Sequence, residues 1–180
     1  MLNLTIRSEH LKAAIGAWIA LISFSLSVAL YSQHYLGMVP CPWCVIQRLF
    51  MLLSLGLSLL MLSSVRLPIA LLVPTLAHLL IQLSGMAASL YQALVASHDS
   101  QCVMGLADKL LMASGLEQSW PWMFAASTSC ADAAKATLFG MSFAWLAFTL
   151  FLLGALFSLV CIGLSLRASF KPLLKEANSP

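Results

Sequence analysis

Four long intervals of this sequence contain no Asp, Glu, Lys or Arg, and they limit the folds that the chain can adopt. They are bounded by Lys12 and Arg48, by Arg48 and Arg66, by Arg66 and Asp99, and by Lys135 and Arg167. Charged residues make up only 8% of the chain, whereas a soluble domain carries about 25%. A helix needs about 20 apolar residues to cross the hydrocarbon of a bilayer. The sequence therefore predicts an integral membrane protein.

The intervals fit an all-α, four-transmembrane-helix bundle that forms a single domain over residues 1–180. The predicted spans cover about 13–31, 45–63, 68–94 and 138–166. Helices satisfy their own backbone hydrogen bonds inside lipid, so this architecture leaves no polar backbone exposed. Two loops, 32–44 and 95–137, then lie together on the side opposite the termini.

The distribution of basic residues predicts which side faces the cytoplasm. The side of the termini carries six basic residues and the other side carries three. Cytoplasmic loops are enriched in Lys and Arg. We therefore expect cytoplasmic termini and two loops that face outward. The net charge is +3, and the basic residues are divided between the two sides without a patch that would indicate a nucleic-acid partner.

The second outer loop is long, and loops of this length are usually either functional or disordered. Two features of this loop favour order. Met104, Leu106, Leu110 and Leu111 recur at helical spacing, which predicts a short interfacial helix. The aromatic cluster at residues 120–124 is typical of a membrane–water interface.

Cys41 and Cys44 form a C-x-x-C pair just before the second predicted span. Pro40 and Pro42 favour extended backbone around Cys41, so regular helix is expected from Cys44 or Val45. Three uses of the pair are open. It could bind a metal together with Cys102 and Cys130, form a structural disulfide, or carry out reversible redox chemistry. Closing so small a ring removes little chain entropy, which favours the redox use.

Arg48 lies one helical turn beyond Cys44, on the same face of the predicted second helix. The start of a helix favours a thiolate at Cys44. Arg48 is predicted at the edge of the hydrocarbon, where a buried charge is costly without a partner. That partner could be the thiolate or an anionic lipid-soluble acceptor; the alternative is an arginine that reaches the headgroups.

The remaining cysteines and two buried polar residues have several possible roles. Cys102 and Cys130 in the second outer loop could form either a structural disulfide or an exchangeable relay pair. Cys161 in the fourth span is expected to be a small buried hydrophobic residue. His78 and Gln82, one turn apart in the third span, could mark a site or form interhelical hydrogen bonds.

The combined pattern resembles the disulfide bond formation protein B (DsbB) family of bacterial membrane thiol oxidases. The residues that carry the resemblance are the Cys41-Pro42-Trp43-Cys44 motif followed by Gln47-Arg48, the pair Cys102 and Cys130, and the stretch 124–131. The resemblance covers nearly the whole chain in span order and loop lengths.

The resemblance implies a quinone-linked protein-disulfide oxidase in the bacterial inner membrane, with both outer loops in the periplasm. Cys102 and Cys130 would carry the disulfide that a periplasmic DsbA-type thioredoxin-fold dithiol attacks. Cys41 and Cys44 would be reoxidised by ubiquinone or menaquinone from the membrane pool, and Arg48 would bind that quinone. No metal is implied, and a monomer is expected.

The sequence departs from the family pattern at three places, one of which is the absence of the usual loop proline just before Cys102, which follows Ser100-Gln101. Many members carry a basic residue or a histidine near the outer end of the third helix, where this chain reads Ala87 to Gln92, and Gln47 stands where some members have an acidic residue. Two other functions compete with the oxidase. One is a membrane scaffold with purely structural disulfides, and the other is a thiol-driven quinone reductase similar to the vitamin K epoxide reductase family.

Overall fold

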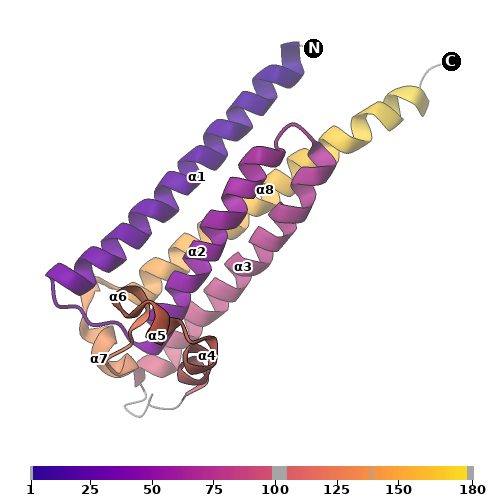
Figure 1. The fold of residues 1–180 in the computed structure, drawn as a ribbon. Coiled ribbons are helices and arrows are strands. Elements are labelled where there is room, and N and C mark those ends of the chain that lie inside the picture. The colour runs from indigo at the N-terminus through magenta and orange to yellow at the C-terminus, as the bar shows by residue number, and fades with distance from the viewer. Residues whose placement is uncertain (1, 99–104, 139, 178–180) are drawn as a thin grey trace.

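Four long helices run side by side in the computed structural model, which describes residues 2–98, 105–138 and 140–177 (Figure 1). They are α1 (Leu2–Tyr35), α2 (Pro42–Ser64), α3 (Pro68–Leu94) and α8 (Phe143–Ala177). Each contains a stretch that is long and apolar enough to cross a membrane. The predicted all-α, four-helix membrane architecture is confirmed.

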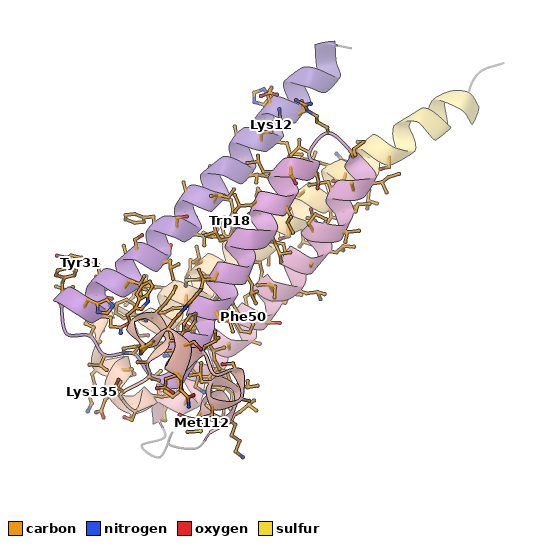
Figure 2. All side chains as sticks on the ribbon, in the orientation of Figure 1. Lys12, Trp18, Tyr31, Phe50, Met112 and Lys135 are labelled. Atoms are coloured by element: carbon orange, nitrogen blue, oxygen red, sulfur yellow. The ribbon has the colours of Figure 1, made fainter. Side chains whose placement is uncertain are left out.

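The short elements between α3 and α8 gather at one end of the bundle, and both termini lie at the other (Figure 1). The short elements are η1 (Ala96–His98), α4 (Leu106–Ser114), α5 (Leu116–Ser119), α6 (Pro121–Phe124), α7 (Cys130–Lys135), β1 (Thr137–Leu138) and β2 (Met141–Ser142). Figure 2 marks Lys12 near the termini and Met112 and Lys135 at the end with the loops. The two loops that carry the cysteine motifs therefore share one end of the molecule.

The second helix begins earlier than the sequence suggested. Regular helix was expected from Cys44 or Val45, but α2 starts at Pro42, and Cys41 is the extended residue that precedes it, with φ −86° and ψ 168°. Proline is well suited to the first position of a helix, because the N–H group it lacks would have no intrahelical partner there.

The fourth long helix begins later than the predicted residue 138. Strands β1 and β2 form a two-stranded antiparallel hairpin, with Thr137 opposite Ser142. Gly140 turns this hairpin with a φ of +78°, a conformation that favours glycine. Helix α8 therefore starts only at Phe143.

Glycines allow α3 and α8 to pack closely. A Cβ atom added at Gly85 of α3 would lie 2.5 Å from the ring of Phe151 on α8. A Cβ added at Gly154 of α8 would lie 2.5 Å from Cδ of Gln82 and 2.6 Å from Cζ2 of Trp18. Neither position has room for a side chain, and small residues at helix contacts are typical of membrane bundles.

A buried hydrogen-bond network joins all four long helices. Trp18 Nε1 of α1 donates to Nε2 of His78 on α3 at 3.1 Å, and Nδ1 of His78 lies 2.7 Å from the hydroxyl of Ser158 on α8. Because the indole N–H can only donate, Nε2 of His78 accepts and its ring hydrogen lies on Nδ1. The hydroxyl of Ser54 on α2 lies 2.8 Å from the same Nε2, and Gln82 donates to that hydroxyl at 2.6 Å. His78 and Gln82 thus form interhelical hydrogen bonds.

The predicted short helix of the second outer loop is α4. Its residues Ala107 and Leu111 are buried against the main apolar core, whereas Leu106 and Met112 are more than 60% exposed. The helix lies against α2. Met104, which the sequence analysis included in this helix, lies outside the described residues.

Candidate functional site

The C-x-x-C motif lies at the start of α2, where the bundle meets its outer loops. The Sγ atoms of Cys41 and Cys44 are 3.2 Å apart, a contact between thiols and not a disulfide bond. Cys41 is fully buried and Cys44 is partly exposed. Cys44 lies in the first turn of α2, where backbone N–H groups without intrahelical partners favour negative charge on sulfur.

The structure brings Cys130 of the second outer loop next to Cys41 of the first. Both side chains are fully buried in one small cluster with Ala96 and Ala133. The pKa of the Cys41 thiol is raised to about 12, chiefly by its hydrogen bond with Cys130 and further by burial. Two cysteines that are 89 positions apart in the chain are therefore neighbours, as disulfide exchange between the loops would require.

Local interactions hold Cys130 in this place. It is the first residue of α7, whose preceding residue Ser129 accepts a hydrogen bond from the Asp132 backbone N–H at 3.1 Å. Lys135 forms a salt bridge with Asp132. The pKa of the Asp132 carboxyl is lowered, chiefly by Lys135 and to a smaller extent by the hydroxyl of Ser129. The backbone N–H of Ser127 also donates to the carbonyl of Pro40 at 3.2 Å, which ties the two outer loops together.

A cavity of about 550 Å³ adjoins Cys44 on the side of α1 and α8. Cys44, Gln47 and Arg48 line its inner wall, and the rest of the lining is mostly apolar. Phe24 of α1 and Leu153 of α8 line it farther along the bundle and are 67% and 48% exposed. Because these residues belong to the apolar spans, the cavity opens toward the lipid and not only toward water.

Arg48 is a buried cation with only neutral partners. Its side chain is 5% exposed. The guanidinium donates to the side-chain oxygen of Gln33, to the Met123 carbonyl at 3.0 Å and to the Ala29 carbonyl at 3.4 Å. Among the described residues no carboxylate pairs with it. Its positive charge at the cavity wall is therefore not neutralised, and it can stabilise negative charge in the cavity.

Two glutamines to which the sequence analysis gave no role complete the surroundings of the sulfur atoms. The amide nitrogen of Gln92, near the end of α3, lies 3.0 Å from Sγ of Cys44 and 3.3 Å from Sγ of Cys41. Gln47 donates to the side-chain oxygen of Gln92 at 2.6 Å. In the sequence, both glutamines lie near the ends of apolar spans and fall at places where the chain departs from the family pattern. These features do not reveal which residues they contact.

The other cysteines and an outer-loop histidine have different positions. Cys161 is buried among Ile15, Met61 and Leu71 in a separate apolar cluster, as expected of a small hydrophobic residue. Cys102 lies outside the described residues. His34 donates through Nε2 to the carbonyl of Trp122 at 2.9 Å, so it links α1 to the second outer loop.

Comparison with known proteins gives one family. Neither the curated proteins nor the solved structures give a match. The family model described as "Disulfide bond formation protein DsbB" matches residues 12–161, which include α2, α3, both outer loops and part of each of α1 and α8. The chain therefore belongs to the DsbB family and is a membrane thiol oxidase of disulfide bond formation.

Proposed function

We propose that this protein oxidises a periplasmic DsbA-type dithiol through Cys102 and Cys130, and passes the electrons through Cys41 and Cys44 to a membrane quinone. One observation carries the proposal. Cys44 lies between a buried group of thiols and an apolar cavity that opens toward lipid. A thiol in that position can exchange electrons with protein sulfur on one side and with a lipid-soluble oxidant on the other.

The cavity fits a quinone in size, polarity and charge. Its volume of about 550 Å³ lies within the usual range for small-molecule sites, which are mostly apolar with a few placed polar groups. Bound there, ubiquinone or menaquinone would supply the oxidising power by taking up two electrons and two protons. Arg48 would hold a carbonyl oxygen of the ring and favour negative charge on it. Cys44 would face the same ring.

The thiol exchange begins at the outer cysteine pair. The reduced partner attacks a Cys102–Cys130 disulfide and leaves as a disulfide, so Cys102 and Cys130 become thiols. The Cys130 thiolate then attacks the Cys41 sulfur of a Cys41–Cys44 disulfide. The new bond joins Cys41 to Cys130, and the electron pair of the broken bond leaves on Cys44.

A second exchange restores the outer pair. Attack of Cys102 on Cys130 forms the Cys102–Cys130 disulfide again and releases Cys41. The two electrons from the partner now reside on Cys41 and Cys44 as a dithiol, from which the cavity ligand removes them. Contact between Cys41 and Cys130 supports this order, because it allows attack on Cys41 while Cys44 remains at the cavity.

A turnover assay tests this function. We would mix purified protein with a reduced thioredoxin-fold dithiol protein and a water-soluble ubiquinone analogue, and follow the loss of quinone absorbance. We expect turnover that is lost on replacing any one of Cys41, Cys44, Cys102 or Cys130 by Ser. Cys161→Ser is the control and should retain full turnover. Absence of turnover in a folded protein would overturn the proposal and favour a scaffold.

The orientation in the bacterial inner membrane has a separate test. Lys109 and Arg66 are both exposed and lie at opposite ends of the bundle. In spheroplasts, a membrane-impermeant thiol reagent should label the Lys109→Cys variant but not the Arg66→Cys variant. The reverse labelling would place the outer loops in the cytoplasm and contradict the proposed periplasmic partner.

A further inference from the structure

One amide group contacts both sulfur atoms of the C-x-x-C motif. Gln92 lies on α3 and is 3% exposed. Its Nε2 group donates to Sγ of Cys44 at 3.0 Å and to Sγ of Cys41 at 3.3 Å. Both distances are short for hydrogen bonds to sulfur, and an amide nitrogen has two hydrogens, one for each acceptor.

Gln47 determines which end of the Gln92 amide faces the sulfur atoms. Its Nε2 group donates to Oε1 of Gln92 at 2.6 Å, so that oxygen is already engaged and the N–H₂ group points to the sulfurs. Gln47 is itself 3% exposed and lines the large cavity. Of the two, only Gln47 lines this cavity; Gln92 approaches the sulfurs from another side.

The chemical consequence follows from what each sulfur species can accept. A thiolate and a disulfide have no hydrogen to donate, so both can only accept hydrogen bonds, and the charged thiolate accepts the stronger ones. A hydrogen bond to the ionised form of a group stabilises that form. The amide itself does not titrate. Within residues 2–98, 105–138 and 140–177, the titratable or charged groups that face Cys44 are Cys41 before α2, Cys130 of α7 through Cys41, and Arg48 one turn along α2.

We propose that Gln92, oriented by Gln47, is a positioning residue that holds the Cys41–Cys44 pair and stabilises the negative charge left on Cys44 when the disulfide opens. The proposal rests on the proposed function for its place in the reaction. The two neutral amides of Gln47 and Gln92 join α2 to α3 and stabilise the thiolate from one side. The charge of Arg48 acts on it from the side of the cavity. Gln47 further couples this pair of amides to the cavity wall, because one side chain contacts both.

The test measures the reactivity of Cys44 against pH in full-length protein that has been reduced and freed of quinone. Alkylation at Cys44 is quantified by peptide mass spectrometry. Gln92→Met keeps the length of the side chain and removes the donor. We expect its half-maximal pH for alkylation to rise by about 1 to 2 units, because hydrogen bonds to charged groups are worth about that much. Gln92→Glu should shift it further, since a carboxylate repels the thiolate.

Gln82→Met provides a matched control. Gln82 is also a buried glutamine of α3, but its hydrogen bonds go to Ser54 and His78. Its alkylation profile should superimpose on that of the native protein even if the helix bundle is weakened. Gln47→Met leaves Gln92 in place without its orienting partner and should give a smaller upward shift. This variant also serves as the second test if Gln92→Met fails to fold.

Two outcomes would overturn the proposal. One is a Gln92→Met profile identical to the native one, and the other is an equal shift in Gln82→Met. Turnover gives an independent check: Gln92→Met should lower kcat and leave the KM for quinone within about twofold, because Gln92 does not line the cavity. The alkylation assay contains neither quinone nor partner protein. Failure of quinone turnover would thus count against the proposed function without deciding the role of Gln92.

Discussion

The guanidinium of Arg48 on α2 donates a hydrogen bond to the backbone carbonyl of Met123 in the second outer loop, with 3.0 Å between nitrogen and oxygen. Met123 belongs to α6 and is buried in the main apolar core. The residue that gives the cavity its positive charge therefore also anchors the loop that presents Cys130. The oxidant site and the thiol-exchange site share this support.

The charge of Arg48 can be separated from its hydrogen bonding by Arg48→Gln. A glutamine can still donate to a neighbouring oxygen but carries no charge. We expect the KM for a ubiquinone analogue to rise about tenfold or more, because the hydrogen bond from the variant to the quinone would no longer be assisted by charge. Arg66→Gln, at the exposed opposite end of the α2–α3 hairpin, is the control and should leave KM unchanged. An unchanged KM in Arg48→Gln would remove Arg48 from the proposed site.

The contact between Cys41 and Cys130 can be tested by cross-linking. In the double variant Cys44→Ser, Cys102→Ser, mild oxidation should join Cys41 to Cys130 rapidly, because both thiols lie in one buried cluster. Mass spectrometry of unreduced peptides would detect the bond. The variant Cys41→Ser, Cys102→Ser retains Cys44 and Cys130. It should cross-link more slowly, because Cys44 lies at the edge of that cluster. Equal rates in the two variants would contradict the proposed order of exchange.

The raised pKa of Cys41 predicts a slow reaction of this thiol near neutral pH. With a pKa of about 12 instead of the usual 9.0, Cys41 stays protonated at pH 8 in the folded protein. Since Cys130 is the main cause, Cys130→Ala in a Cys44→Ser background should speed alkylation of Cys41 at pH 8 about tenfold, corresponding to roughly one pKa unit. A phosphine reductant keeps both thiols reduced during this measurement. No acceleration would show that burial alone suppresses Cys41.

The same pKa shift has a defined effect on stability. A thiol whose pKa is higher in the folded than in the unfolded state stabilises the fold fully at pH below 9.0. That contribution is lost as the pH rises from 9.0 toward 12, because the unfolded chain loses its proton first. Thermal unfolding in detergent should therefore show a steeper loss of stability above pH 9 in native protein than in Cys41→Ser.

Helix packing around the buried polar network can be tested with two glycines of the same helix. Gly154→Ala would place a methyl group 2.5 Å from Gln82 and 2.6 Å from Trp18. We expect a loss of about 1–3 kcal/mol of stability, typical of overpacking in a core. Gly163→Ala meets no atom within 4 Å and should leave stability unchanged or slightly raised. Equal unfolding temperatures for the two variants would contradict the close α3–α8 packing.

The architecture and the class of chemistry could be predicted from the amino-acid sequence. Charge-free intervals of membrane-spanning length leave few alternatives to a helical bundle, because lipid cannot hydrogen-bond to exposed backbone. The C-x-x-C pair and Arg48 were recognisable because they lie within eight residues of one another, so helical spacing alone relates them. Residues at this spacing lie on the same face whenever the segment is helical, whatever the rest of the fold.

Contacts between residues that are distant in the chain could not be predicted without the folded structure. Spacing along the chain could not bring Cys130 to Cys41, orient Gln92 toward two sulfur atoms or direct Arg48 to the carbonyl of Met123. Spacing along the chain also could not predict the hairpin that precedes α8, or the hydrogen bonds of His78 to the other helices. These contacts depend on how separate helices and loops pack against one another, and that packing is a property of the whole chain.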